Sequence, residues 1–478
     1  MAAPVIHWFR RDLRLTDNLA LDAAARTGAP VIPVFIFDPA ILRGRYFGVP
    51  RLAWLIKTLA ALDARLRRQG ARLLIRQGSP RRVLAELAAQ TGAAAVYLNR
   101  DYTPYALRRD EDIKRMLNIP VYVFDDGLLH PPGAVLKPDQ TPFAVFTPFK
   151  KKWLTLNKTL PVGQPGDCFI PAGGLSLPFD DLPTLAALGF DGNFKTPEAG
   201  EEAAQRRLYD FLARRIHNYQ TGRDRLASDP DDDTRGGWSF LSPYFRFGLI
   251  SPRQVYWAAR EAYREAGTPE ARRSVEQYIG ELIWREFYAH ILHFHPHALD
   301  GNFRPEYDVL QWRDEPNDLQ AWTEGRTGYP VVDAAMRQLQ HMGWMPNRAR
   351  MIAASFLTKD LLINWQAGER FFMQWLIDGD PAQNNGGWQW TAGTGTDAQP
   401  YFRVFNPVSQ SQKFDPDGAY IRRWLPELRG VPLPFIHAPW TMDSPPRDYP
   451  PPIADHAFAR ERALAAFGAA RQNQGDAS

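Results

Sequence analysis

The sequence contains one cysteine, Cys168, and no run of 18 apolar residues. A single thiol excludes internal disulfide bonds and metal centres built from several cysteines. Without a long apolar run, no membrane-spanning helix is expected, and the opening MAAPVIHWFRRD lacks the basic–apolar–small order of a signal peptide. These absences predict a cytoplasmic protein that works in a reducing environment and does not bind a membrane.

The signatures of several common catalytic sites are also missing. There is no Gly-x-Ser-x-Gly elbow, and Cys168 lies in a Pro- and Gly-rich stretch, so no nucleophile is apparent. The histidines of HILHFHPH, 290–297, have no carboxylate at the spacing of a zinc site. We therefore expect them to serve packing or surface roles, and we expect no metal.

Arginine and tryptophan, in contrast, are abundant. The 478 residues include 47 Arg against 10 Lys, with a net charge of +4. Arg grips phosphate through a planar fork and stacks on rings, but an Arg excess also follows from the base composition of a genome, and both explanations stay open. Twelve of the 15 Trp lie after position 237, which indicates that the two halves of the chain have different roles.

Residues 1–130 alternate apolar runs with helical patterns, which predicts a five-stranded, parallel, doubly wound α/β sheet. The expected strands are Val5–Phe9, Val31–Phe37, Leu73–Gln77, Ala94–Leu98 and Val121–Phe124. The expected helices are Asn18–Arg26, Arg51–Gln69, Pro80–Gln90 and Pro104–Leu117. The first strand leads into Arg10-Arg11-Asp12 and not into a Gly-rich turn, so a dinucleotide is not expected to bind there.

Residues 131–200 are rich in Pro and Gly and have few periodic stretches, which predicts a connector along the surface. From 201 to 478 the pattern is helical, which predicts an all-α domain. The expected helices cover 201–219, 252–266, 270–292, 331–342, 347–365 and 369–377.

The stretch 378–406, DGDPAQNNGGWQWTAGTGTDAQPYFRVFN, is the most informative one. The adjacent Gly386 and Gly387 disfavour a helix, so we expect irregular backbone here. Its tryptophans and its short polar side chains suit a flat, polar-edged ligand such as a flavin or a nucleobase. A buried loop whose Trp side chains only fill the core is the alternative.

Three further segments carry candidate chemistry. In 274–292, a polar helix face with Tyr278, Glu281 and Arg285, bordered by Trp284, suits a half-wet cleft in which bases stack; a solvated Glu–Arg pair on an ordinary amphipathic helix is the alternative. In 343–365, Asn347 and Met351 share a face after the helix-starting Pro346, and packing is again the alternative. In 238–248, Ser239, Ser242 and Pro243 predict a capped helix start that could hold phosphate or serve as a cap alone.

Together these segments resemble the photolyase/cryptochrome family, and most closely its class I cyclobutane pyrimidine dimer photolyases. The matching blocks run along nearly the whole chain, and their order and length exclude chance agreement. They are HWFRRDLRLTDN at 7–18, LSP at 241–243, ELIWREFY at 281–288, TGYPVVDAAMRQL at 327–339, GWMPNRARMIAASFL at 343–357, DGD at 378–380, NNGGWQW at 384–390 and FNPVSQSQKFD at 405–415.

The resemblance implies an α/β antenna domain, 1–130, a connector, 131–200, and a helical domain, 201–478, that holds FAD. It implies a lyase that repairs pyrimidine dimers in UV-damaged DNA with blue light, by electron transfer from excited, reduced FAD to the flipped-out dimer. A cryptochrome-like blue-light receptor is the alternative. No protein partner is implied, and a monomer is expected.

The resemblance also assigns roles to residues. The expected FAD-binding residues are Tyr219, Trp238, Ser239, Leu241, Ser242, Tyr278, Arg350, Asp378, Asp380 and Asn384, with Asn384 against flavin N5. The expected lesion- or DNA-binding residues are Arg223, Tyr278, Glu281, Trp284, Arg285, Asn347, Arg348, Met351, Trp390 and Gln410. Glu281 and Asn384 are expected to act in the reaction, and Trp388, Trp365 and Trp312 to carry electrons from the surface to the flavin.

The sequence departs from the family pattern at three places. Trp238 stands where Thr or Ser is usual, and an Asp-rich loop at 228–233 precedes it. Tyr105 and Ala106 occupy the positions of an Asn–Glu pair found in folate-binding relatives. A second chromophore is expected, either methenyltetrahydrofolate or an 8-hydroxy-deazaflavin; Arg51 and Asp101 suit the deazaflavin better.

Overall fold

The N-terminal part of the chain forms a five-stranded, all-parallel sheet in the strand order β3-β2-β1-β4-β5. The computed structural model describes residues 2–227, 237–398, 400 and 403–475. The strands are β1 (Val5–Phe9), β2 (Val31–Phe37), β3 (Leu74–Gln77), β4 (Val96–Asn99) and β5 (Val121–Phe124). All five predicted strands are confirmed. The prediction succeeded because continuous apolar runs are typical of strands in parallel sheets that helices cover on both faces.

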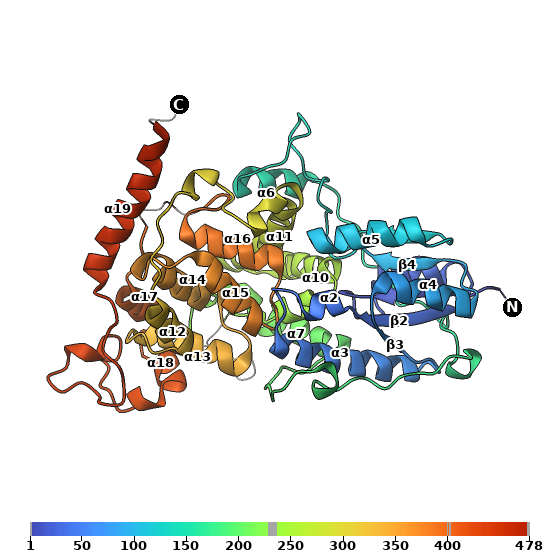
Figure 1. Ribbon diagram of the computed structural model, residues 1–478, viewed down its shortest axis with the longest axis horizontal. Coiled ribbons are helices and arrows are strands. Elements are labelled where there is room, and N and C mark those ends of the chain that lie inside the picture. The colour runs from blue at the N-terminus through green and yellow to red at the C-terminus, as the bar shows by residue number, and fades with distance from the viewer. Residues whose placement is uncertain (1, 228–236, 399, 401–402, 476–478) are drawn as a thin grey trace.

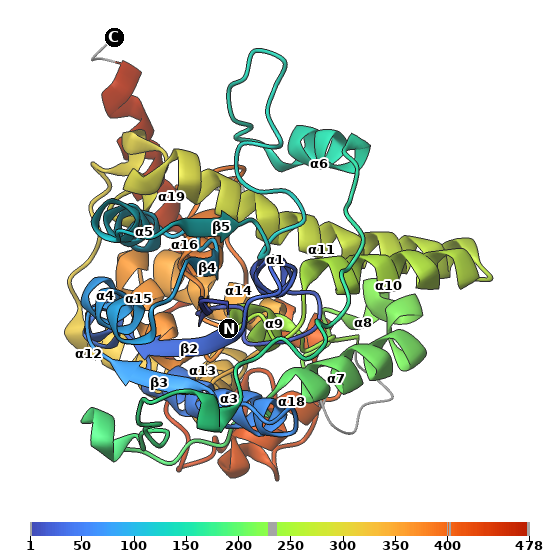
Figure 2. The ribbon, with the colours of Figure 1, turned by 90° about the vertical axis from the view of Figure 1, so that its right-hand side faces the viewer.

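Helices cover both faces of this sheet (Figure 2). Ile6 and Trp8 of β1 pack toward α4 (Pro80–Thr91) and α5 (Pro104–Met116), whereas Val5 and Phe9 pack toward α1 (Leu19–Ala25) and α3 (Val49–Arg67). This split follows from the alternation of side chains along a strand. The sequence did not indicate the short helix α2 (Pro39–Leu42).

The segment predicted to be an irregular connector contains one helix of ten residues, α6 (Phe146–Thr155). Phe149 and Trp153 lie one turn apart on α6 and are both buried. Otherwise the connector holds two short 3₁₀ turns, η1 (Ala172–Gly174) and η2 (Ala186–Leu188). Two buried positions four residues apart are a weak helical signal, which explains why the sequence did not predict α6.

The rest of the chain is helical and lies beside the α/β part (Figure 1). Its longest helix is α11 (Pro269–Phe294). The other helices are α7 (Glu201–Arg214), α8 (Tyr219–Gly222), α9 (Ser242–Arg246), α10 (Pro252–Glu265), α12 (Pro316–Glu324), α13 (Pro330–Met342), α14 (Asn347–Ser355), α15 (Trp365–Trp375), α16 (Pro381–Ala392), α17 (Pro407–Phe414), α18 (Ala419–Trp424) and α19 (His456–Gly475). Across the described residues, no helix is both long and apolar enough to span a membrane.

The expectation of irregular backbone after residue 378 was wrong, because residues 381–392 form the helix α16. Asp380 caps its first amides, and Gly393, with φ +84°, ends it. Gly386 is needed for packing: a Cβ on it would lie 2.2 Å from Cδ1 of Tyr288 on α11. Gly386 thus lets two helices approach closely, and this packing outweighs the low helix propensity of glycine.

Two other local predictions also differ from the structure. The helix predicted over 347–365 ends at Ser355, continues as one π-helical turn, Phe356–Asp360, and breaks at Leu362, whose φ is +53°. Ser242 is the first residue of α9, Leu241 is its N-cap, and the Ser242 hydroxyl bonds elsewhere. The Asp-rich loop at 228–233 lies outside the described residues.

The basic run after β1 ties the sheet to the helical part. Arg11 forms ion pairs with Asp101 of the α/β part, at 3.3 Å, and with Asp380 at the start of α16. Arg14 donates to the Gly248 carbonyl at 3.0 Å, and Asp17 accepts from Arg253 of α10. These charges replace the Gly-rich turn of a dinucleotide-binding sheet, and they fix the position of α16 relative to the sheet.

Candidate functional site

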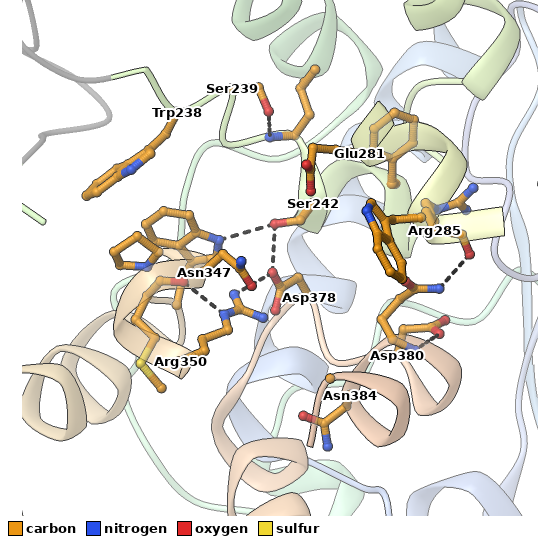
Figure 3. A pocket seen from close by; sticks show the side chains of 18 of the residues that line it. Trp238, Ser239, Ser242, Glu281, Arg285, Asn347, Arg350, Asp378, Asp380 and Asn384 are labelled. Atoms are coloured by element: carbon orange, nitrogen blue, oxygen red, sulfur yellow. Dashed lines mark hydrogen bonds and ion pairs between the residues drawn. The ribbon is translucent and has the colours of Figure 1, made fainter. Parts of the chain in front are cut away.

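A large cavity lies in the helical part, where α8, α9, α11, α14 and α16 converge (Figure 3). Its volume is about 720 Å³, which is ample for a cofactor or a substrate. Most of the residues that the sequence singled out line it: Tyr219, Arg223, Trp238, Ser239, Leu241, Ser242, Tyr278, Glu281, Trp284, Arg285, Asn347, Arg348, Arg350, Met351, Asp378, Asp380, Asn384, Trp388 and Trp390.

One wall is built around the buried carboxylate of Asp378. Its Oδ2 accepts hydrogen bonds from the Ser242 hydroxyl at 2.6 Å and from Arg350 Nη2 at 2.8 Å. Trp344 Nε1 in turn donates to the Ser242 oxygen at 3.2 Å. The other oxygen, Oδ1, is buried and has no partner among the described residues. An unsatisfied buried acceptor is costly, so this oxygen is suited to a hydrogen-bond donor on a ligand.

A second wall is cationic. Asp380 caps α16 through Ala382 N and Gln383 N, and its other oxygen pairs with Arg11. Burial alone would raise the pKa of the Asp380 carboxyl, but Arg11 and Arg246 outweigh it and hold the pKa below its usual range. Burial, followed by repulsion from Arg11, lowers the pKa of Arg246 to about 9. Arg246 Nε and Nη1 find no acceptor within the described chain, so this wall can receive an anionic group.

Helix α16 brings Asn384 and Trp388 to the cavity. The side-chain amide of Asn384 donates to the Glu369 carbonyl of α15 at 3.0 Å, which fixes its orientation. Trp388 is buried, and a Cβ on Gly368 of α15 would lie 2.1 Å from its ring, so the ring rests directly on that backbone. This contact holds Trp388 in a single position at the cavity wall.

Helix α11 supplies the wall that the sequence predicted as a half-wet face. Glu281 pairs with Arg223 and accepts from Gln277 Nε2 at 3.0 Å. Tyr278 packs edge-on against Tyr219, with ring centroids 5.2 Å apart. The predicted residues Tyr278, Glu281, Trp284 and Arg285 therefore line one side of the cavity, and their role in binding bases stays a prediction.

Helix α14 lies on another side. Asn347 Nδ2 lies 3.4 Å from Met351 Sδ, so the two share a face as predicted. Arg348 pairs with Asp224 at 2.9 Å and lies over the Phe414 ring. Arg350 points from the same helix to Asp378, which confirms the predicted pair.

The segment before α9 differs from a simple phosphate loop. Trp238 donates from Nε1 to the Arg223 carbonyl at 3.1 Å, and its ring lies edge-on to Trp344, with centroids 5.2 Å apart. The Ser239 hydroxyl accepts from Leu241 N at 3.4 Å, a long hydrogen bond that a ligand can replace. Trp238 thus adds an aromatic edge at the position where the resemblance led us to expect Thr or Ser.

Three predicted residues do not line the cavity. Trp365 is fully buried and donates to Asn302 Oδ1 at 2.9 Å, and Trp312 is half-buried near the surface. Gln410 lies on α17, and no described residue bonds its buried Oε1. Trp365 belongs to the same core cluster as Trp388, and Trp312 packs against that cluster, whereas Gln410 makes no cavity contact.

The residues assigned to a second chromophore are held by protein contacts. Arg51 donates to the carbonyls of Met373 at 2.9 Å and Leu376 at 2.6 Å, at the end of α15. Asp101 pairs with Arg11, and the Tyr105 hydroxyl donates to Asp38 at 2.6 Å. The kind of second chromophore stays a prediction.

Sequence reasoning missed Arg246 and Trp344. Arg246 lies more than 100 residues before Asp380, and Trp344 reaches Asp378 through Ser242, which lies about 100 residues before it, so only the fold brings them together. The FRFG at 245–248 lies in the candidate segment 238–248, and the GW at 343–344 begins a matched block, but neither carries a spacing that indicates a ligand. The histidines of 290–297 pack against rings: His290 lies 5.1 Å from Phe149 and 4.8 Å from Phe294.

Comparison with known proteins shows which family shares this sequence. A family model described as "DNA photolyase" matches residues 5–165, and one described as "FAD binding domain of DNA photolyase" matches residues 278–469. The curated deoxyribodipyrimidine photo-lyase of a Synechococcus species is 43% identical, over 98% of this chain and 97% of that one. The chain belongs to the photolyase/cryptochrome family.

Solved structures of the family have the same fold. A class III photolyase from Agrobacterium tumefaciens superposes with a TM-score of 0.89 at 38% identity, covering 99% of this chain and 98% of that one. A cryptochrome from Synechocystis gives a TM-score of 0.87 at 29% identity, covering 97% and 99%. These structures agree with the assignment to the family. A photolyase and a cryptochrome share this one architecture, so the fold identifies the family and not the class within it.

The cavity fits the FAD that the matched family model names. FAD carries ring N–H donors and an anionic pyrophosphate. The cavity presents the complementary groups: the unsatisfied acceptor Asp378 Oδ1 and the unsatisfied donors of Arg246. The residues that would hold it are those of the two walls, with Ser239, Ser242 and Arg350 beside Asp378, and Asp380 and Arg246 opposite.

Proposed function

We propose that this chain is a deoxyribodipyrimidine photo-lyase that repairs cyclobutane pyrimidine dimers in DNA. The observation that carries the proposal is one cavity that combines unsatisfied groups suited to FAD with a wall of Trp284, Trp390 and Glu281 suited to an extruded lesion. The name of the Synechococcus relative supports it. Bound FAD, when reduced and excited by light, supplies the electron that opens the cyclobutane ring.

The chain itself binds and orients the lesion. A dimer stacks poorly in the duplex, so extruding it costs less than extruding a normal base. Trp284 and Trp390 offer rings for it, worth roughly 1–3 kcal/mol per stacked base. Glu281 can hydrogen-bond the pyrimidine edge, and the guanidinium of Arg223 beside it favours negative charge as it develops on the dimer.

The lining also supports a cyclobutane dimer over the (6-4) photoproduct. Asn347 and Met351 line the cavity, and the resemblance to the family implies that (6-4) enzymes place histidine chemistry in this region. Among the described residues, no histidine lines the cavity. We therefore favour the class I cyclobutane enzymes, although the Agrobacterium structure shows that class III shares the fold.

Trp388, Trp365 and Trp312 form the proposed route for electrons from the surface to the flavin. Trp388 lines the cavity, Trp365 is buried in the same core, and Trp312 packs against the Phe467 ring at 6.1 Å, where it is half-buried. The order from cavity to surface supports the route. Asn384, anchored on the Glu369 carbonyl, is proposed to face the flavin ring.

The proposal is tested with purified, chemically reduced protein and an oligonucleotide that carries one thymine dimer. Blue light should restore the two thymines, and an identical sample in the dark is the control. An oligonucleotide with a (6-4) photoproduct should stay unrepaired. If light removes no dimers, the chain is not a dimer photolyase.

A blue-light receptor is the second candidate, favoured by the likeness to the Synechocystis cryptochrome. A receptor has no need for an extruded base. Affinity for a short duplex with a dimer, compared with the same duplex undamaged, separates the two functions. Equal affinity for both duplexes would favour the receptor.

A further inference from the structure

The connector, although remote in sequence, reaches the wall of the cavity. The ring of Phe146, the first residue of α6, stacks on the ring of Trp284 on α11, with centroids 3.6 Å apart and planes 8° apart. Phe287 meets both rings edge-on, at 5.7 Å and 5.6 Å. Trp284 lines the cavity and Phe146 does not, so Phe146 covers the Trp284 face that a ligand does not use.

Phe146 is itself held from a second direction. Its backbone N–H donates to Asp397 Oδ2 at 3.1 Å, and the Thr396 hydroxyl donates to the Ala144 carbonyl at 2.5 Å. Residues 396 and 397 belong to the loop that follows α16, the helix that carries Trp388 and Trp390. The position of Phe146 therefore does not depend on Trp284 alone.

This arrangement restricts the Trp284 ring. Next to an open cavity, a Trp side chain packed on one edge only could adopt several rotamers. With one face covered by a parallel ring and an edge against Phe287, the Trp284 ring keeps its plane. A base that stacks on a ring already in place does not bear the entropy of ordering it.

We propose that Phe146 is a positioning residue for lesion recognition, which orients Trp284 so that an extruded pyrimidine dimer stacks on it. The inference rests on the proposed function, because it needs a flipped base as the ligand. It makes the connector a part of the substrate wall and not only a link between domains. Aromatic ring pairs contribute enough to change affinity between about twofold and tenfold.

The test uses the flavin-containing full chain and three variants. Phe146→Leu removes the ring, Phe146→Tyr keeps it, and Phe143→Leu alters a neighbouring connector ring that packs edge-on against Phe149 instead. Affinity is measured for a duplex with one thymine dimer and for the undamaged duplex. Repair is then measured in single turnovers with saturating damaged DNA, and flavin absorption and the melting temperature check each fold.

Phe146→Leu should bind the damaged duplex about twofold to tenfold more weakly, with unchanged affinity for the undamaged duplex. Its repair rate at saturation should stay near that of the wild type. Phe146→Tyr and Phe143→Leu should discriminate as the wild type does. If Phe146→Leu loses its flavin, Phe146→Met, which fills similar space without a ring, replaces it with the same expectation.

Unchanged discrimination in the variant without the ring would overturn the inference, as would an equal loss in Phe143→Leu. In both cases the proposed function would stand if the wild type still preferred the damaged duplex. If the wild type itself showed no preference, the proposed function would fail, and the role of Phe146 with it.

Discussion

Replacing Gly386 by alanine tests whether glycine is needed at this position for α16 to pack against α11. The new Cβ would lie 2.2 Å from Cδ1 and 2.4 Å from Cε1 of Tyr288. Carbon atoms prefer about 3.5–4.0 Å, so the ring or the helix must move by more than about 1 Å. Overpacking of this kind costs about 1–3 kcal/mol, whereas the helix propensity of alanine returns up to about 1 kcal/mol. The variant should be less stable by up to about 2 kcal/mol.

Gly387 provides the matched control. It is the next residue of the same helix, and a Cβ on it would meet nothing within 4 Å. Gly387→Ala should therefore stabilise the chain by up to about 1 kcal/mol through helix propensity alone. The same substitution at adjacent positions should thus shift stability in opposite directions.

The measurement is the urea concentration at the midpoint of unfolding, monitored by the circular dichroism signal of the helices. Flavin-free protein is used, so that contacts of FAD with Gly387 do not enter. A shift of both variants in the same direction would refute the packing argument. A higher urea midpoint in the Gly386 variant would mean that α11 and α16 can move apart without loss of stability.

Three further predictions concern the site and its support. Trp388→Phe should block photoreduction of oxidised FAD but spare repair by chemically reduced enzyme; equal photoreduction in both proteins would exclude the proposed route. Glu281→Gln should lower the repair yield per photon more than the affinity for damaged DNA, and a wild-type yield would remove Glu281 from the reaction. Burial raises the pKa of the Glu286 carboxyl to about 7, so between about pH 4.5 and pH 7 the folded state holds a proton that the unfolded chain has released. The stability that this group contributes should fall as pH rises through that window. The midpoint of unfolding should therefore depend less steeply on pH in Glu286→Gln than in the wild type. Identical slopes would contradict the shifted pKa.

The division of the chain at 130 and 200 stays a prediction, and the structure adds a detail to it. The connector holds α6, and through Trp153 Nε1, which donates to Glu286 at 2.5 Å, it is anchored on α11. The same helix α6 begins with Phe146. A segment that appeared in the sequence as a surface link is therefore part of the packing around the cavity.

The sequence by itself determined the parallel sheet, the helical second half and most of the cavity residues. Buried parallel strands and amphipathic helices have local periodicities, and the ordered blocks around Glu281, Asn347 and Asp378 identify a family without any coordinates. Only the tertiary structure decided that 381–392 is a helix, that Phe146 supports Trp284, and that Arg11 and Arg246 serve the same cavity as Asp380. The physical reason is that local propensity is worth about 1 kcal/mol at most for each such residue. Contacts between residues far apart in sequence, such as Gly386 against Tyr288, cost or contribute more than that, and no local pattern records them.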